Sequence, residues 1–316
     1  MDTVRGLVVR IKGAVFYVET GLGEIPCSLR GRFRLGSAPE DVLPVVGDTV
    51  AVGIDRSRAA AKSQGVIVEL GERRSILART DPSQRQGSRI LGANMDQAVL
   101  VFAVREPDLN LRLLDRMLVS ASCGSMDAVI CINKMDLGSL PGEIDEALAP
   151  YRAMGYRCVR SSALTGEGVD DLAGLLAGKI SIFAGPSGSG KSSLVSRMQP
   201  GLELAVGNVS ARTGKGTHTT SHFELHRLDR GGYLGDTPGV REFGIWGVSK
   251  ERLASFFRDF APFRSSCRFA SCTHSHEPDC AVKVAVERGE VFPQRYESYL
   301  RILDTVPDER GLKRTW

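Results

Sequence analysis

The segment Gly185-Pro-Ser-Gly-Ser-Gly-Lys-Ser192 constrains the fold of this chain more than any other stretch. It follows an apolar run expected to be a strand, residues 179–184, and opens a predicted helix over residues 191–198. A glycine-rich loop in that context wraps its backbone N–H groups around a phosphate, and the helix N-terminus adds positive potential. We therefore predict a nucleotide site in which Lys191 reaches the β- and γ-phosphates and Ser192 ligates Mg²⁺. The residues expected around the phosphates are Gly185, Pro186, Ser187, Gly188, Ser189, Gly190, Lys191, Ser192 and Ser193.

Two further motifs follow neighbouring predicted strands and point to guanine. Asn133-Lys-Met-Asp136 ends the strand predicted over residues 128–132, at the carboxyl edge where such sheets bind ligands. The Asp136 carboxylate can accept two N–H bonds from guanine, a donor pair that adenine does not offer. Asn133 can hold either the loop or the base. Ser161-Ser-Ala163 follows the next strand, and its N–H groups are expected at guanine O6. The predicted guanine residues are Asn133, Lys134, Met135, Asp136, Ser162 and Ala163.

Asp236-Thr-Pro-Gly239 ends a third predicted strand. Asp236 is expected to hold Mg²⁺ through water, and the N–H of Gly239 to sense the γ-phosphate; an ordinary Asp-x-Pro-Gly turn is the alternative. The polar, glycine-rich residues 212–220 have the composition of a nucleotide-dependent switch, in which either Thr219 or Thr220 completes the Mg²⁺ shell.

The group that orients the attacking water is not obvious. Val240 follows Gly239, where many GTPases carry a glutamine, and an apolar side chain cannot orient water. His218 is the candidate catalytic residue beside Lys191, although a surface or RNA-contacting histidine explains it equally well. We expect slow intrinsic hydrolysis that a partner accelerates.

The order of these motifs is permuted. In familiar GTPases the phosphate loop precedes the guanine motif, whereas here residues 133–136 and 161–163 precede residues 185–192. Each motif still lies at its own strand end, so the expected site is unchanged. The permutation makes the segment after Gly239 lead directly into a cysteine-rich region.

Four stretches of different pattern divide the chain. Residues 1–78 contain short predicted strands without helices, which favours a small all-β closed barrel. Residues 79–90 are polar, basic and aperiodic, as expected of a linker. Residues 91–248 alternate apolar strands with helices, which predicts a wound α/β sheet. Residues 249–316 are mainly helical.

Three cysteines and two histidines crowd into the helical stretch. Cys267, Cys272, His274 and Cys280 offer a full tetrahedral shell for one structural zinc ion, although His276 could replace His274 by position. Buried, unligated cysteines are the alternative. Farther along, Arg295, Tyr296, Tyr299 and Arg301 mix cations and rings in a way that suits RNA, but ordinary packing explains them better.

The composition restricts the class of protein. No apolar run of membrane-spanning length and no secretion signal is present, so we expect a cytoplasmic chain without a membrane partner. The net charge is +4, and the whole excess lies in residues 1–90, which hold 14 Lys and Arg against 10 Asp and Glu. A polyanion could use that excess, as could a solvated surface.

With its permuted order, its phosphate loop, the Gly216-Thr-His-Thr-Thr220 segment and the Cys-x₄-Cys-x-His-x₅-Cys cluster, the chain resembles the bacterial ribosome small subunit-dependent GTPase A family. The resemblance implies an oligonucleotide/oligosaccharide-binding (OB) barrel, a circularly permuted P-loop GTPase domain and a zinc domain. It also implies late maturation of the small ribosomal subunit, with contacts to its rRNA and hydrolysis of GTP to GDP and phosphate stimulated by that subunit. We expect a monomer. Ser189 stands where a β-branched apolar residue is usual, which should leave phosphate binding intact.

Two other functions fit parts of the pattern. A nucleotide-gated RNA-binding protein with weak hydrolysis would share the motifs, although Lys191 and Ser192 argue against an inactive site. A signalling or transport GTPase that does not act on ribosomes would not need the basic barrel.

Overall fold

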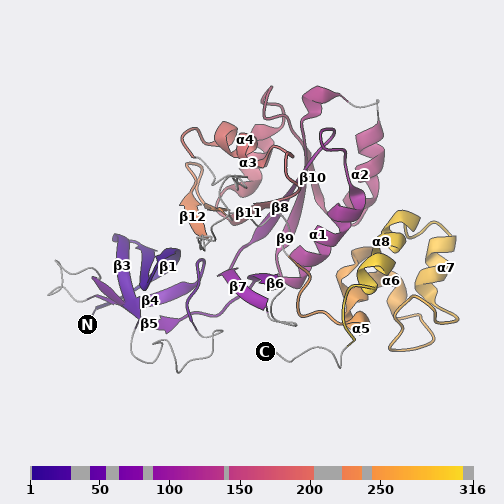
Figure 1. Cartoon of the computed structure of the whole chain (residues 1–316), viewed down its shortest axis with the longest axis horizontal. Helices are drawn as coiled ribbons and strands as arrows, with labels where there is room; N and C mark the ends of the chain where they lie inside the picture. Colours follow the sequence, from indigo (N-terminus) through magenta and orange to yellow (C-terminus); the bar gives the residue numbers. More distant parts are fainter. Residues whose placement is uncertain are drawn as a thin grey trace, which may run out of the picture.

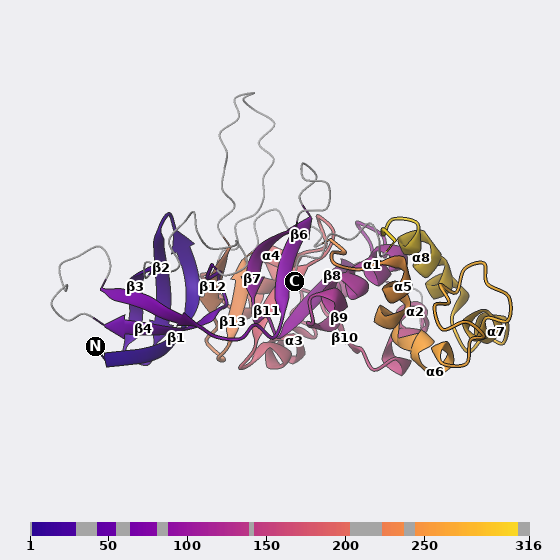
Figure 2. The ribbon, with the colours of Figure 1, turned by 90° about the horizontal axis from the view of Figure 1, so that it is seen from below.

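The computed structural model describes residues 2–29, 43–54, 64–80, 88–138, 142–202, 223–236 and 244–308. Figure 1 shows a β-barrel at the N-terminal end, a sheet with helices on its two faces in the middle, and a group of short helices at the other end. Figure 2 shows the same order along the long axis. Within the described ranges, no helix is both long enough and apolar enough to cross a membrane.

Among the described residues, five strands form the barrel: β1 (Asp2–Lys12), β2 (Val15–Thr20), β3 (Gly23–Leu29), β4 (Thr49–Ile54) and β5 (Gly65–Leu70). They pair in the order β1-β2-β3-β5-β4, and β1–β4 pairing closes the cylinder. Gly6 belongs to both pairings of β1, and a Cβ there would lie 2.5 Å from the Val18 side chain. Val8, Val18, Val52 and Ile67 are fully buried inside. The predicted closed barrel is confirmed.

A hairpin adjoins the barrel where the sequence predicted a linker. β6 (Ile76–Thr80) and β7 (Ser88–Ala93) pair antiparallel, so both overlap residues 79–90, and residues 81–87 lie outside the described residues. The amide of Ala93 donates to the carbonyl of Val46 over 2.9 Å and attaches the hairpin to the barrel side. The domain limits at 78, 90 and 248 stay a prediction.

The predicted alternation of strands and helices in the middle of the chain is confirmed. The strands are parallel in the order β10-β9-β8-β11-β13, and β12 pairs antiparallel with β13. The strands are β8 (Gln97–Ala103), β9 (Asp127–Asn133), β10 (Arg157–Arg160), β11 (Ile180–Ala184), β12 (Glu224–Arg227) and β13 (Tyr233–Asp236). The helices are α1 (Leu111–Cys123), α2 (Glu143–Ala153), α3 (Val169–Leu176) and α4 (Lys191–Met198).

Strand β8 explains why the sheet needs helices on both faces. All of its residues are buried, and alternate side chains point to opposite faces. Ala98, Leu100 and Phe102 pack with α1 and α2, whereas Val99 and Val101 pack with α3 and α4. The central strand therefore belongs to two apolar cores.

Barrel and central sheet share hydrogen-bonded strands. β1 pairs antiparallel with β12, with Arg10 opposite Glu224, so one sheet of eleven strands runs through both bodies of the described chain. An exposed ion pair between Arg227 and Glu19, 3.0 Å apart, lies at the same junction. Screening by solvent makes the ion pair a minor contribution, and the backbone pairing defines the junction.

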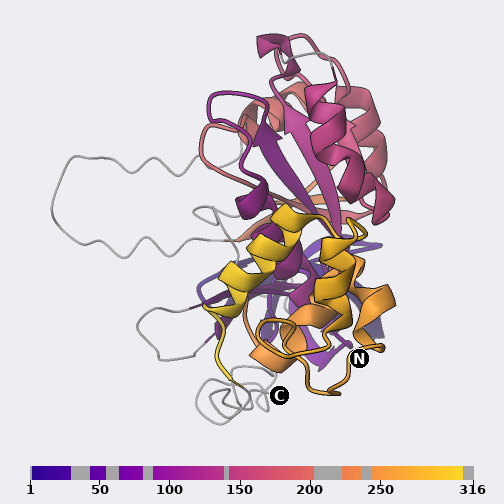
Figure 3. The same cartoon turned by 90° about the vertical axis from the view of Figure 1, so that its right-hand side faces the viewer.

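The C-terminal segment is helical and lies against α1 (Figure 3). Phe257, Phe260 and Tyr299 are fully buried in its core, and Val119 of α1 joins them. Its helical elements are α5 (Lys250–Leu253), η5 (Ala254–Phe256), η6 (Arg258–Phe260), α6 (Ala261–Arg264), α7 (Ala281–Glu287) and α8 (Pro293–Leu303).

A buried ion cluster connects α1 with this segment. Arg295 of α8 contacts Asp115 of α1 at 2.5 Å and Asp259 of η6 at 3.0 Å, and the Arg295 and Asp115 side chains are 4% and 1% exposed. The hydroxyl of Tyr151 from α2 donates to Asp115 over 2.8 Å. Burial raises the pKa of Asp115, against the lowering effect of Arg295. Four elements therefore depend on one guanidinium and its partners.

Candidate functional site

The carboxyl edge of the parallel strands brings the predicted motifs together. β9 ends at Asn133, β10 is followed by Ser161, β11 is followed by Gly185, and β13 ends at Asp236. Because these strands are parallel, the loops that follow them lie at one edge of the sheet. In doubly wound sheets this edge is where ligands bind.

Glycine conformations shape the phosphate loop. Gly185 has φ +144°, and a Cβ there would lie 2.0 Å from the carbonyl oxygen of Val101 in β8. Gly190 has φ +88° and is the N-cap of α4. The Lys191 ammonium donates to the carbonyls of Gly185 and Pro186, each over 2.8 Å, which holds the cation against the loop. The N–H groups at the start of α4 and this cation can therefore face one anion.

Asn133 ties the guanine motif to the phosphate loop. Its side chain is buried; Nδ2 donates to the carbonyl of Ser189 over 2.9 Å, and Oδ1 accepts from the amide of Ala163 over 3.2 Å. A Cβ at Gly190 would lie 2.2 Å from Nδ2, so this close approach requires glycine. Both ends of the amide are engaged with loops, which favours the loop-holding role over contact with a base.

The remaining guanine-motif residues lie around the neighbouring loop. Asp136 is exposed, and its carboxylate accepts a hydrogen bond from the Ser162 hydroxyl. Lys134 has a left-handed backbone with φ +62°, and its ammonium donates to the carbonyl of Glu106. Met135 donates its amide to the carbonyl of Ser161 over 3.1 Å. The two loops are therefore held together with an exposed carboxylate between them.

One segment at this edge was missed by the sequence analysis. Residues 104–110 connect β8 to α1, and the amide of Val104 donates to the carbonyl of Asn133 over 3.0 Å. The ring of Pro107 lies 3.6 Å from the position that a Cβ at Gly188 would take. This loop therefore contacts the guanine motif and lies beside the phosphate loop. The loop carries no recognisable motif. The sequence feature that could have identified it is its position after a fully buried strand.

Several predicted residues lie outside the described part of the chain. These are His218, Thr219, Thr220 and Gly239, together with Val240. Asp236 is described as the last residue of β13, but its side chain is not. Ser192 in the first turn of α4 is the predicted Mg²⁺ ligand that the structure describes with its side chain. The roles assigned to the others stay predictions.

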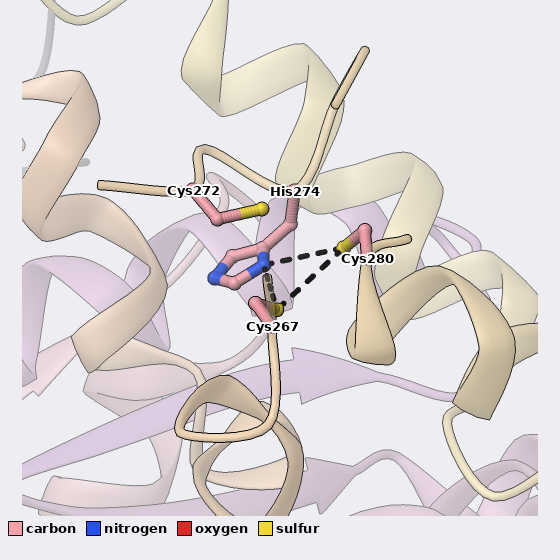
Figure 4. Close-up of side chains that lie close together, drawn as sticks. All are labelled: Cys267, Cys272, His274 and Cys280. Carbon is pink, nitrogen blue, oxygen red and sulfur yellow. Dashed lines mark hydrogen bonds between the residues drawn. The ribbon is translucent and has the colours of Figure 1, made fainter. Parts of the chain in front are cut away.

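The predicted metal ligands form one cluster (Figure 4). The donor atoms of Cys267, Cys272, His274 and Cys280 all lie within 4.8 Å of one another. His274 Nδ1 is 3.4 Å from the sulfurs of Cys267 and Cys280, and those two sulfurs are 3.9 Å apart. A tetrahedron with zinc–sulfur bonds of about 2.3 Å has edges of about 3.8 Å. His276 is exposed and contacts the Ser275 hydroxyl instead. The donor set therefore fits a metal ion held through His274.

Burial shifts the pKa values of this cluster in directions that bear on metal binding. Burial raises the pKa of the Cys272 thiol to about 12 and raises the pKa of Cys280. Burial also lowers the pKa of His274, which favours the neutral imidazole that a metal requires. Thiolates in such a place are stabilised by a bound cation rather than by the protein alone.

Hydrogen bonds fix the loop that carries the cluster. Tyr296 donates to the carbonyl of His274 over 2.7 Å, and Tyr299 donates to the carbonyl of Thr273. Glu277 accepts from the amide and hydroxyl of Thr273 over 2.6 and 2.7 Å. Burial alone would raise the Glu277 pKa, but these hydrogen bonds lower it to about 2. The helix α8 therefore supports the metal loop directly.

The contacts of α8 also distinguish between RNA binding and internal packing for two of its residues. Arg295 and Tyr299 are buried, at 3% and 0% exposure, and both make contacts inside the protein. Arg301 is exposed on the same helix. The packing explanation therefore holds for Arg295 and Tyr299.

Sequence comparisons identify relatives over nearly the whole chain. The RsgA GTPase family model matches residues 70–246. The protein named small ribosomal subunit biogenesis GTPase RsgA from Caldanaerobacter subterraneus subsp. tengcongensis is 40% identical over 309 residues, which cover 98% of each chain. The protein of the same name from Gemmatimonas aurantiaca is 44% identical over 301 residues, with 95% of this chain and 96% of the relative covered.

Solved structures show the same architecture. The crystal structure of YjeQ from Thermotoga maritima matches with a TM-score of 0.79 and 35% identity, covering 96% of this chain and 99% of YjeQ. The structure of YloQ, described as a circularly permuted GTPase, matches with a TM-score of 0.75 and 28% identity, covering 99% of this chain and 97% of YloQ. The permuted motif order and the fold agree with these relatives, and the chain belongs to the RsgA GTPase family.

Proposed function

We propose that this protein binds and hydrolyses GTP during biogenesis of the small ribosomal subunit, as the names of its relatives describe for them. The observation that carries the proposal is the double contact of Asn133, whose amide joins the phosphate loop to the loop after β10. A base between Asp136 and Ala163 and phosphates at Lys191 can then belong to one nucleotide. Adenine would leave the carboxylate of Asp136 without its donor pair.

The residues at the sheet edge divide the work on GTP. Backbone N–H groups of residues 185 and 187–193 bind the phosphates, and Lys191 stabilises the negative charge that shifts during cleavage of the terminal phosphoric anhydride bond. Ser192, Asp236 and Thr219 or Thr220 are proposed to hold Mg²⁺, which when bound neutralises charge on the β- and γ-phosphates. Gly239 is proposed to contact the γ-phosphate through its amide.

Water activation is proposed to depend on His218 and on the small subunit. Val240 cannot orient water, so the isolated protein should turn over slowly and accelerate when the subunit completes the site. His218→Ala should then reduce subunit-stimulated hydrolysis while GDP affinity stays unchanged. Equal stimulated rates in both proteins would remove the histidine from the mechanism.

The other parts of the chain fit an rRNA-binding protein. Residues 1–90, which include the barrel and the basic segment after it, carry the excess of positive charge, and this supports contact of that part of the chain with rRNA. The Cys267, Cys272, His274 and Cys280 cluster is proposed to hold one structural zinc ion in residues 249–316. We further propose that the protein acts in the cytoplasm as a monomer, with residues 79–90 between the barrel and a GTPase domain of residues 91–248.

Co-sedimentation with purified small ribosomal subunits tests the proposal. The protein should pellet with subunits more strongly with a non-hydrolysable GTP analogue than with GDP, and subunits should accelerate GTP hydrolysis. Asp136→Ala should weaken binding of guanine nucleotides and abolish the difference between the two nucleotides. Equal affinity for ATP and GTP would contradict the nucleotide assignment. Nucleotide-dependent hydrolysis without association with subunits would contradict the ribosomal role.

A further inference from the structure

A hollow of about 450 Å³ lies between α1, α2 and the start of α8. Its walls are mainly apolar, since Leu111, Ala147, Pro150 and Phe292 line it. It therefore joins the helices of the central sheet to the helix that supports the metal loop. None of the described residues that line it belongs to the nucleotide motifs, although Leu111 is the first residue of the helix that follows the 104–110 loop.

Phe292 is the unusual residue of this hollow. It is 46% exposed, whereas Tyr151, the other aromatic residue of the lining, is 2% exposed. Phe292 is the N-cap of α8 and is followed by Pro293, so the backbone at the helix start fixes where the ring can lie. A large ring held at the mouth of an apolar hollow leaves apolar surface that a partner side chain can cover.

The polar groups of Arg295 and Tyr151, which line the hollow, already form contacts within the protein. The guanidinium of Arg295 contacts Asp115 and Asp259. The hydroxyl of Tyr151 donates to Asp115. Arg295 is the cation among the described residues that line the hollow, and because two carboxylates match its charge it is not offered to an anionic ligand.

The charge around the hollow is negative. Glu143 and Glu146 line it, and both lie in the first turn of α2, which also carries Asp145. Asp145 faces Arg152 and Arg160 at 2.9 and 3.0 Å, so its charge is locally compensated. The chain as a whole has a net charge of +4, so the negative charge around this hollow is opposite in sign to the net charge of the protein. Phosphate groups of RNA would be repelled here, whereas lysine and arginine side chains would be attracted.

We propose that the hollow binds a lysine- and arginine-rich segment of a protein component of the small ribosomal subunit. This inference rests on the proposed function and names a partner for it. One large apolar side chain of the segment packs between Leu111 and Phe292, and its cations face Glu143 and Glu146. Proteins that pack against rRNA carry excess lysine and arginine to neutralise phosphates, so the subunit offers such segments. A segment bound here contacts helices of the GTPase domain and of the C-terminal segment at the same time.

Charge reversal distinguishes a basic protein segment from RNA by the sign of its effect. The full-length Glu143→Lys/Glu146→Lys variant should bind purified small subunits about tenfold or more weakly at a fixed salt concentration, because like charges would then face each other. RNA in the hollow would instead be bound more tightly by the same variant. The matched control is Glu287→Lys/Glu290→Lys, which makes the same charge change on exposed residues away from the hollow and should not weaken binding. GDP affinity and thermal unfolding of each variant check that the fold is intact.

A photo-crosslinking residue placed at Gln294, which lines the hollow, identifies the occupant directly. With full-length protein on small subunits, the crosslink should reach a lysine- and arginine-rich segment of a ribosomal protein. A crosslink to rRNA, to a second copy of this chain or to its own residues 309–316 would overturn the inference, as would unchanged affinity of the charge-reversal variant. If the wild-type protein does not bind subunits at all, the proposed function itself fails.

Discussion

The central sheet and the C-terminal segment are stabilised in different ways. The sheet has a fully buried central strand, β8, with apolar cores on both faces. The C-terminal segment has helical elements of 3 to 11 residues and contains an aromatic core, a buried ion cluster and a cluster of four residues that could hold a metal ion. Helices of a single turn are not stable alone, so their positions must come from contacts elsewhere. One chain can therefore combine two kinds of region. The structure of the central sheet follows from its local sequence pattern, whereas the structure of the C-terminal segment depends on specific long-range contacts.

Metal removal should produce the largest difference in stability between the central sheet and the C-terminal segment. Binding of structural zinc contributes on the order of 10 kcal/mol in small zinc domains, so chelation or Cys280→Ser should unfold much of the C-terminal segment. The central sheet has its own cores and should keep GDP affinity within a few-fold. Hydrogen exchange measured with and without chelator checks both regions. Full protection of α7 and α8 after the metal is gone would contradict this prediction.

Arg295→Met should have the next largest effect on stability. It leaves Asp115 and Asp259 buried without their cation, which should cost about 4 kcal/mol in the free energy of unfolding. The control is Arg268→Met, because the Arg268–Asp279 pair is exposed and should contribute less than about 1 kcal/mol. Denaturant unfolding measures both. Replacing all three members of the buried cluster by apolar residues should recover most of the loss, which a simple loss of packing would not predict.

Leu100→Ala tests the central sheet in the same assay. The side chain is fully buried in the core under α1 and α2, so its truncation should cost about 3 kcal/mol. Metal affinity of the purified variant should remain unchanged, because the cluster is built by other elements. A parallel loss of zinc would show that the two regions depend on each other more than their contacts indicate.

The smallest expected effect is a gain in stability at Ser189. Its side chain is buried, and its hydroxyl has no hydrogen-bond partner in the part of the chain that the structure describes. Ser189→Ala should therefore stabilise the protein by about 1 kcal/mol, while its backbone contact with Asn133 and the affinity for GDP are retained. Thermal unfolding and nucleotide titration check this. A destabilised variant would show that the hydroxyl has a partner that the described residues do not include.

Local sequence patterns predicted most of the fold. Asn110 and Gly124 bracket α1, both residue types that favour helix ends, and the Asn110 side chain accepts from the amide of Leu113 over 3.0 Å. The alternation of apolar strands with helices predicted the central sheet, because each strand carries its own hydrophobic signal. The metal ligands could also be predicted, since cysteine and histidine spacing restricts the possible sites.

Contacts between distant, unpatterned residues were not predictable. The β6–β7 hairpin includes residues 79–80 and 88–90, which resembled part of a linker, because pairing across strands leaves no periodic signal in a basic segment. Arg295 gave no sign in the sequence that it would be buried beside Asp115, 180 residues away. The position of the 104–110 loop depends on its contacts with the neighbouring loops. In each case the structure depends on partners that sequence proximity does not reveal.

The pairing of β1 with β12 has a mechanical consequence. β12 is hydrogen-bonded to β13, whose last residue is Asp236, and to the first strand of the barrel through Arg10 and Glu224. A sliding movement of β12 must either carry the barrel with it or break that pairing. The position of the barrel is therefore coupled to the position of β12 through this pairing.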